Sequence, residues 1–315
     1  MFSSSALKKK KNSPSLSKDD FNILDSYITI EGRKYHNIDG LGYPLPCDES
    51  EASRLIILHF IFRLIFGGNF SSPVSDLLSA GGMTVLDIGC GPGAWVSENC
   101  KNYPKSTFIG LDIISANFPS EKFPNAAFIQ CNVLDGIPFP ANTFDFIHQR
   151  GLLRAFTSKD WRNVIDEICR VLKLGGRVEF LEKDLKFINM GPIMKTFSDA
   201  MFMESAENDI NPYVIHKLDE FLKDTGKIEN IETIEKIAPI GSWGGRLGEL
   251  IFRNLFNSLN GLRGKLLPIL DISIEKYDSL LNQLEEDVNK NHTSYRLVRI
   301  FGQKKLDHAA YQINP

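Results

Sequence analysis

The chain has 315 residues, of which 43% are hydrophobic and 24% are charged, and its formal net charge is −3. These proportions are typical of a globular protein with one large or two small domains. The slight acidic excess argues against a nucleic-acid-binding surface spread over the whole protein, so we expect no nucleic-acid partner.

The five cysteines include no CxxC pair, which predicts buried reduced thiols and argues against a zinc site or a disulfide framework. No stretch reaches the ~20 apolar residues of a membrane span, and the N-terminus lacks the apolar run of a secretory signal. We therefore expect no metal, no membrane association and a cytoplasmic location, while the lysine run at 8–11 leaves a nuclear location open.

Residues 1–20 are rich in Ser and Lys and predict a disordered tail. Residues 21–82 predict an N-terminal arm that ends in an amphipathic cap helix, with Asp48 or Ser50 as its N-cap. The apolar residues at helical spacing, which form the expected buried face, are Leu55, Ile56, Phe60, Ile61 and Leu64.

Residues 83–184 alternate short apolar strands with helices, a pattern that predicts a doubly wound α/β domain with a parallel sheet and right-handed crossovers. Residues 185–305 predict a helical insertion followed by the last strands of the same sheet, and 306–315 a C-terminal tail. The expected helices are 190–207, 212–224, 244–260 and 273–290, and the expected strands are IENIETIEKIAP and SYRLVRIFGQ.

A glycine-rich loop, DIGCGPGAW, follows the first strand of the α/β domain. Gly89, Gly91 and Gly93 allow the backbone to turn sharply and to approach a ligand closely. A dinucleotide fingerprint reads G-x-G-x-x-G, and Ala94 at the third glycine position is a replacement that some such folds accept. The spacing alone therefore leaves NAD open as a ligand.

Two carboxylates flank this loop. Asp87 stands two residues before the first glycine, where it suits the cationic amino-acid end of S-adenosylmethionine better than a pyrophosphate. Asp112 ends the next strand, FIGLD, where it can accept hydrogen bonds from both ribose hydroxyls of a nucleoside. Together they favour a methyl donor, although a structural role for Asp87 stays open.

Four segments occur in order along the chain: VLDIGCGPGAW, FIGLDI, FIQCNVLDGIPFPANTFDFIHQR and WRNVIDEICRVLKLGGRVEFLEKD. They resemble the sequential motifs of class I S-adenosylmethionine-dependent methyltransferases, and RKYHNIDGLGYPLPCDESEASRL and PIGSWGGRLGELI resemble fungal members related to regulators of secondary metabolism. The resemblance covers residues 30–303 and implies a seven-stranded, mostly parallel sheet.

The resemblance also implies the cofactor, S-adenosyl-L-methionine, and the residues that bind it. Asn132 departs from the aspartate that is commoner at its position, but its amide can still read adenine. The implied set comprises the donor loop (Asp87, Gly89, Cys90, Gly91, Gly93), the ribose pair (Asp112, Ile113), the adenine pair (Asn132, Val133), and Gln149 at the methionine part.

His148 is the candidate general base, although a histidine at a strand end is more often a packed structural group. An activated sulfonium methyl makes such a base optional. We expect a small-molecule acceptor, with a protein acceptor still open, in a pocket formed by the N-terminal arm and the helical insertion. Its candidate lining residues are Tyr35, Tyr43, His59, Met201, Met203, Tyr213 and Trp243.

Two other functions remain open at this stage. An NAD-dependent oxidoreductase shares the fold, the glycines and Asp112, but the sequence shows no Tyr-x-x-x-Lys hydride-transfer site. A protein that binds the donor without turnover, as a regulator or scaffold for a partner, would keep the same loop, because fold and cofactor site do not fix function.

Overall fold

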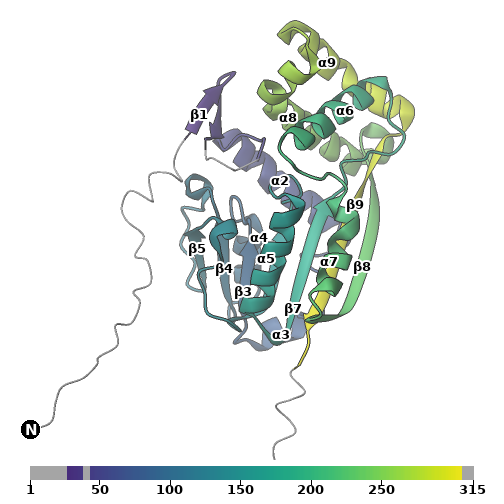
Figure 1. The fold of residues 1–315 in the computed structure, drawn as a ribbon. Helices are drawn as coiled ribbons and strands as arrows, with labels where there is room; N and C mark the ends of the chain where they lie inside the picture. Colours follow the sequence, from purple (N-terminus) through teal and green to yellow (C-terminus); the bar gives the residue numbers. More distant parts are fainter. Residues whose placement is uncertain (1–26, 38–42, 307–315) are drawn as a thin grey trace, which may run out of the picture.

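The computed structural model describes residues 27–37 and 43–306 (Figure 1). The predicted tail at 1–20 and residues 307–315 lie outside this part of the chain. Within it, no helix combines the length and the apolar character that crossing a bilayer requires.

Seven strands form one sheet in the order β5-β4-β3-β6-β7-β9-β8. Strand β9 runs antiparallel to β7 and β8, and the other neighbouring pairs are parallel. This topology confirms the predicted doubly wound, mostly parallel sheet. The strands are β3 (Thr84–Ile88), β4 (Thr107–Asp112), β5 (Ala126–Gln130), β6 (Phe144–Arg150), β7 (Leu172–Lys183), β8 (Ile228–Pro239) and β9 (Ser294–Lys304).

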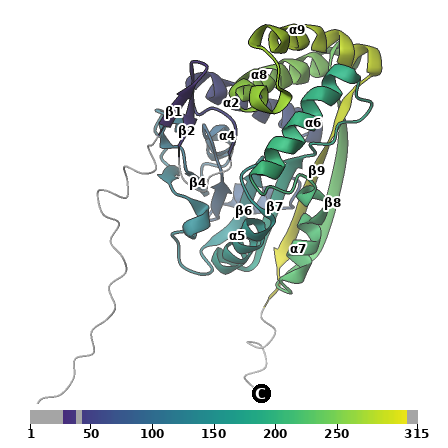
Figure 2. The same cartoon turned by 45° about the horizontal axis from the view of Figure 1, so that its top comes forward.

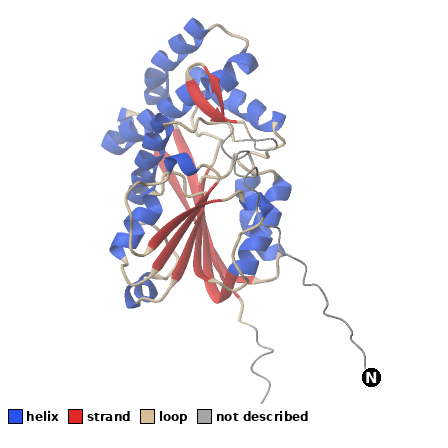
Figure 3. Cartoon of the chain, turned by 90° about the vertical axis from the view of Figure 1, so that its left-hand side faces the viewer, coloured by secondary structure: helices blue, strands red, loops and turns tan. Residues whose placement is uncertain are grey.

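Helices cover both faces of the sheet, so that the strands lie between two helical layers (Figure 3). Alternation along β3 divides the core, because Leu86 packs with α5 (Ser158–Val171) and α7 (Leu218–Asp224), whereas Val85 packs with α3 (Ser75–Ala80) and α4 (Ala94–Asn102). Short 3₁₀ helices connect other elements: η1 (Ser115–Asn117), η2 (Val133–Asp135), η3 (Val214–Lys217) and η4 (Ser242–Gly244).

A second group of helices lies beyond one end of the sheet (Figure 2). It contains α2 (Glu49–Phe66), α6 (Pro192–Glu207), α8 (Gly245–Leu270) and α9 (Ile274–Asn291), which share a separate hydrophobic core. Helices α8 and α9 connect β8 to β9, so the chain leaves the sheet and returns to it. The predicted helices 190–207, 244–260 and 273–290 correspond to α6, α8 and α9, with α8 extending ten residues past its predicted end at 260. The predicted helix 212–224 is wrong in part, because the structure has the 3₁₀ helix η3 followed by the short helix α7 there.

The cap helix α2 has Asp48 as its N-cap, whose side chain accepts a hydrogen bond from the Glu51 amide. Its predicted buried face is wrong in part. Ile61 is fully buried, but Ile56 is 40%, Phe60 45% and Leu64 65% exposed. The helix instead turns a polar side inward, because its buried residues include Glu51, Arg54 and His59.

The sequence analysis missed a small hairpin before α2. Strands β1 (Tyr27–Ile30) and β2 (Arg33–His36) pair in antiparallel fashion. The hydroxyl of Tyr35 donates to the carbonyl of Gly261 in α8 at 2.6 Å, and this buried contact fixes the hairpin on the helical group. The N-terminal arm is therefore a hairpin followed by a cap helix.

Candidate functional site

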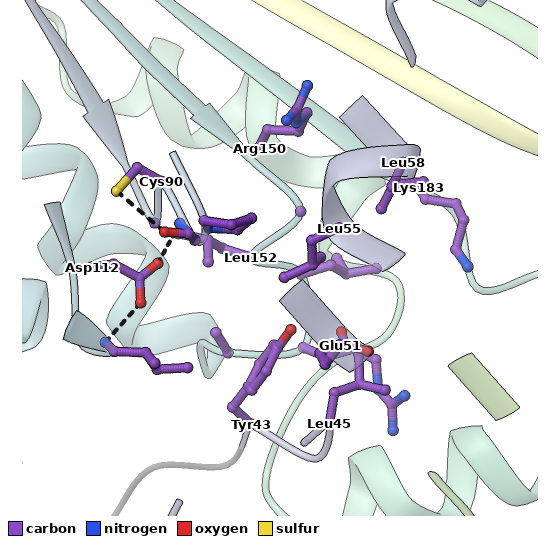
Figure 4. Close-up of a pocket in the computed structure, with 18 of the residues that line it drawn as sticks. Tyr43, Leu45, Glu51, Leu55, Leu58, Cys90, Asp112, Arg150, Leu152 and Lys183 are labelled. Atoms are coloured by element: carbon purple, nitrogen blue, oxygen red, sulfur yellow. Dashed lines mark hydrogen bonds between the residues drawn. The ribbon is translucent and has the colours of Figure 1, made fainter. Parts of the chain in front are cut away.

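A cavity of about 240 Å³ lies at the carboxyl ends of β3, β4 and β6, beneath α2 and α8 (Figure 4). The strand order reverses between β3 and β6, since β4 and β5 continue on one side and β7 on the other. Ligands bind at such a switch point in open α/β sheets. The predicted site residues that line the cavity are Asp87, Gly89, Cys90, Gly91, Asp112, Ile113, Asn132 and Val133.

Asp112 holds the glycine loop in place from the end of β4. Its Oδ2 accepts a hydrogen bond from the Gly91 amide at 2.7 Å, and its Oδ1 accepts one from the Ile114 amide at 2.8 Å. Burial raises the pKa of Asp112 to about 6 despite these donors. Each carboxylate oxygen keeps a second lone pair, so the residue can still accept hydrogen bonds from a vicinal diol.

Asn132 and Val133 stand at the start of η2, after β5. The Asn132 side chain caps η2, because its Oδ1 accepts a hydrogen bond from the Leu134 amide at 3.1 Å. That contact commits the oxygen and leaves the Nδ2 amide as the group that can donate to a ring nitrogen. An amide donor beside the apolar Val133 fits a planar nitrogen heterocycle.

Asp87 and His148 are neighbours across β3 and β6, on the face that α4 covers. The His148 Nδ1 lies 2.7 Å from Asp87 Oδ1, and the imidazole stacks on Trp95 with ring centroids 4.1 Å apart and planes 2° apart. His148 is 1% exposed, does not line the cavity, and has its pKa lowered by burial. From this position His148 can orient the Asp87 carboxylate, but it does not face the cavity as the predicted general base would have to.

Gln149 also fails to reach the cavity. It is fully buried on the opposite face of the sheet from His148, and its Nε2 donates to Glu182 Oε1 at 2.6 Å. Glu182 lines the cavity and also accepts hydrogen bonds from the Leu152 and Leu153 amides. Gln149 therefore orients Glu182 and the loop after β6, whereas the sequence analysis expected it at the methionine part of the donor.

The glycines of the loop mainly allow the backbone to pack closely against neighbouring side chains of the protein. Gly89, Gly91 and Gly93 all have positive φ, at 67°, 53° and 72°. A Cβ on Gly89 would lie 2.7 Å from Leu152 Cδ2, and one on Gly93 would lie 2.5 Å from Phe128 Cε1. Gly93, which the sequence analysis expected to contact the donor, does not line the cavity. Only at Gly91 is the nearest atom, at 3.6 Å, in ordinary contact, so a ligand can approach there.

Arg150, which the sequence analysis missed, lines the cavity at the end of β6. Its Nη1 lies 3.2 Å from His59 Nδ1, and His59 Nε2 lies 2.6 Å from a carboxylate oxygen of Glu98. Burial and the Arg150 charge lower the pKa of His59 to about 4, so His59 is neutral and accepts from Arg150. Burial lowers the pKa of Arg150 to about 10, while the nearby Asp87 charge opposes that shift.

Asp87 and Arg150 thus bring opposite charges to the ends of two adjacent strands. Arg150 stays protonated at neutral pH, because its pKa of about 10 is well above 7. The pair complements a zwitterion, with Asp87 suited to an ammonium group and Arg150 to a carboxylate.

The region beneath α2 and α8 is mostly apolar. Of the predicted acceptor-pocket residues, Tyr43 and Met201 line the cavity. Tyr35 and His59 are buried elsewhere, and Met203, Tyr213 and Trp243 are surface residues that are 54%, 52% and 40% exposed. The apolar lining that the sequence analysis did not identify includes Leu45, Leu58, Phe62, Leu185, Ile251, Leu255 and Tyr295.

Further charged residues at the cavity were missed, among them Glu51 and Arg54, which pair with each other on α2, Arg154 in the loop after β6, and Lys183 at the end of β7. The carboxyl ends of parallel strands meet at one edge, so the strand GGRVEFLEKD already carried a signal for Lys183. The Glu51–Arg54 pair carried none, because only the docking of α2 brings it to this edge. Among the described residues, no group of three His, Cys, Asp or Glu side chains could hold a metal.

Comparisons with known proteins find a methyltransferase domain in this chain. Residues 85–176 match the model of a methyltransferase domain. The chain is 31% identical to the secondary metabolism regulator laeA of Coprinopsis cinerea over 49% of this chain and 38% of that protein. It is 22% identical to the N-methyltransferase gliN of Aspergillus fumigatus over 84% of this chain and 96% of that protein. The matched region thus spans less than half of the regulator but nearly all of the N-methyltransferase.

A solved structure, phosphoethanolamine N-methyltransferase 2 of Haemonchus contortus with S-adenosyl-L-methionine, aligns with a TM-score of 0.47 at 19% identity, covering 79% of this chain and 57% of that one. Residues 85–176 thus match a methyltransferase domain, and the ordered motifs and the sheet topology are typical of the class I S-adenosylmethionine-dependent methyltransferase fold.

Proposed function

We propose that the protein transfers a methyl group from S-adenosylmethionine to a small-molecule acceptor by in-line displacement. The observation that carries this proposal is the convergence of Asp87, Asp112 and Asn132, from three separate strand ends, on one cavity. Each brings a polar group that suits a different part of the donor, and the family supports the same cofactor.

The nucleoside part of the donor is held from the β4 and β5 side. Asp112 accepts hydrogen bonds from the ribose hydroxyls with the lone pairs that Gly91 and Ile114 leave free. Asn132 donates from Nδ2 to an adenine nitrogen, and Val133 and Ile113 pack against the rings.

The amino-acid part is held from the β3 and β6 side. Asp87 attracts the ammonium group and Arg150 the carboxylate, while His148 and His59 orient these two side chains by hydrogen bonds. The buried imidazole of His148 keeps the Asp87 carboxylate in one direction, as a positioning residue.

When bound, S-adenosylmethionine supplies a sulfonium methyl group that is already activated. The protein therefore has to align the acceptor and exclude water. Leu55, Leu58 and Phe62 of the cap helix α2 form an apolar wall over the cavity and serve this exclusion. The apolar lining near α8 favours an acceptor small enough to enter, which is why we propose a small molecule over a protein.

We also propose the division into an N-terminal arm at 21–82, a donor-binding core at 83–184 and a helical insertion with the last strands at 185–305. The proposed location is the cytoplasm or the nucleus.

The proposed transfer is tested with methyl-labelled S-adenosylmethionine. Purified protein is incubated with the label and either a small-molecule extract or a protein extract of the source organism, with Asp112→Ala as the matched control. We expect label in the small-molecule fraction with the wild-type protein and none with the variant. Label in the protein fraction would overturn the acceptor class. No label in either fraction, with donor binding intact, would instead support a non-catalytic regulator.

A further inference from the structure

Lys183 lies at the carboxyl end of β7 and lines the cavity away from the donor loop. In the close-up, Lys183 and Asp112 are at opposite sides of the cavity (Figure 4). Glu182, the preceding residue, points to the other face of the strand and binds Gln149 and the loop after β6. Lys183 thus belongs to the part of the cavity that the proposed donor contacts do not use.

The acidic groups around Lys183 are committed to other partners. Asp184, the acidic neighbour that favours its charged form, pairs with His216 Nε2 at 3.2 Å and accepts from the Lys186 amide at 2.8 Å. Among the described residues, no carboxylate lies within ion-pair distance of Lys183. A cation that lines a cavity without such a partner is poorly compensated.

Two arginines also line this part of the cavity, and each is paired with a glutamate. Arg54 and Arg154 both line the cavity, and both disfavour the charged form of Lys183. Arg54 is paired with Glu51 and Arg154 with Glu204, so each pair is neutral as a whole. The Nε of Arg154 is buried and has no hydrogen-bond partner among the described residues. In this part of the described cavity, Lys183 is therefore the cation that has no carboxylate partner.

The remaining wall around Lys183 is apolar and aromatic. The Lys183 ammonium lies 5.6 Å from the ring centroids of both Tyr295 and Phe187. Leu185, Met201 and Leu255 line the same cavity. An apolar chamber with one uncompensated cation is complementary to a molecule that has an apolar body and an acidic group.

We propose that the acceptor of this enzyme is a small molecule with an apolar or aromatic body and one anionic group, which Lys183 binds. This inference rests on the proposed methyl transfer and deepens it, since it names the acceptor class. The anionic group of the acceptor neutralises the Lys183 charge. Glu51 and Glu204 do not do so, because they are already paired with Arg54 and Arg154.

The test uses a matched pair of fluorescent probes that differ only by one sulfonate group. Anilinonaphthalene sulfonate carries one anionic group, and phenylnaphthylamine has the same ring system without it. Both are titrated into the full-length protein with and without saturating S-adenosylhomocysteine. The variants are Lys183→Met and Lys183→Arg, with Lys186→Met as the control, because Lys186 is exposed and does not line the cavity.

We expect Lys183→Met to weaken binding of the sulfonate probe roughly tenfold, as the loss of one charged hydrogen bond implies, and to leave the neutral probe within about twofold. Lys183→Arg and Lys186→Met should both retain the preference for the sulfonate. Equal effects on the two probes in Lys183→Met, or loss of the preference in Lys183→Arg as well, would overturn recognition by charge.

The two proposals fail in different ways. If S-adenosylhomocysteine does not bind to any of the proteins, the proposed function fails, and the probe titrations without it still decide whether Lys183 selects anions. If it binds normally and the probes show no dependence on Lys183, only the acceptor class is wrong. Thermal unfolding of each variant shows whether the probes were added to folded protein.

Discussion

His148 and Asp87 form a hydrogen bond of 2.7 Å between Nδ1 and Oδ1, wholly inside the protein and directly behind the glycine loop. An ionised carboxylate accepts and cannot donate, so the imidazole carries its proton on Nδ1. The other nitrogen, Nε2, is buried without a hydrogen-bond partner among the described residues. The histidine is therefore turned toward the acid and away from any acceptor in the cavity.

We predict that His148→Phe weakens binding of S-adenosylhomocysteine roughly tenfold. The phenyl ring can keep the stack on Trp95, but it leaves the buried Asp87 carboxylate without its donor, and hydrogen bonds to charged groups contribute about 1.5–3 kcal/mol. Isothermal titration measures the affinity. A variant that binds normally but has lost turnover would show that His148 acts on the acceptor as a base.

Arg150 is predicted to recognise the carboxylate of the donor. Arg150→Met should weaken S-adenosylhomocysteine by roughly 10- to 100-fold, since a charged hydrogen bond contributes about 1.5–3 kcal/mol. Methylthioadenosine lacks the amino-acid end, so its affinity should change by no more than about twofold. His59→Ala, which removes the acceptor that orients Arg150, should show the same selectivity to a smaller extent. Equal losses for the two ligands would contradict this role.

Donor affinity should depend on the ionisation of Asp112. Its pKa is raised to about 6, so at lower pH the free protein holds a protonated carboxyl that accepts ribose hydrogen bonds less well. We predict that the affinity for S-adenosylhomocysteine rises as pH increases through about 6, by up to roughly tenfold, and then levels off. Titration of Asp112→Asn at the same pH values is the control, and it should show a weak and flatter dependence.

The preference for an anionic probe should disappear at alkaline pH. Burial, together with the charges of Arg54 and Arg154, lowers the pKa of Lys183 to about 8, against the opposing effect of Asp184. Lys183 is therefore charged below about pH 8 and neutral above it, so the sulfonate preference should be full near pH 6.5 and decline as pH rises through about 8. A preference that persists unchanged to about pH 10 would point to an arginine as the recognising group.

The cap helix α2 should depend on a buried polar bridge to α8. Asn254 accepts from Arg54 Nη1 and donates to the Arg54 carbonyl, both at 2.9 Å. Asn254→Ala removes both contacts and leaves a buried guanidinium donor unpaired, so we predict a loss of about 2 kcal/mol in the free energy of unfolding. Asn257→Ala is the matched control on the same helix, because Asn257 is exposed, and it should change stability by less than about 0.5 kcal/mol. Chemical denaturation measures both.

The sheet and most of the helices were predictable because local pattern determines them. The run IENIETIEKIAP coincides with β8, and the glycine loop with its two flanking acids lines the cavity at the end of the sheet. The buried face of α2 was not predictable in this way. Its apolar residues follow helical spacing, yet the side that docks on α8 and the cavity carries Arg54 and its partners, which only the tertiary arrangement reveals.

The partners of side chains at the strand ends could not be predicted from the sequence either. Gln149 and His148 are adjacent at the end of β6, so their side chains point to opposite faces of the sheet. The register of β6 with β3 and β7 determines which residues each of them contacts. Arg150 and Lys183 stand at strand ends where ligands are expected, but their importance depends on which carboxylates lie near them. That information comes from segments far apart in the chain.

Isothermal titration of the purified protein with S-adenosylhomocysteine and, separately, with NAD, using Asp112→Ala as the control, tests the cofactor assignment most directly. We predict that S-adenosylhomocysteine binds in the micromolar range, that the variant loses this binding, and that NAD does not bind. Binding of NAD with no binding of S-adenosylhomocysteine would contradict the assignment of this cavity to a methyl donor.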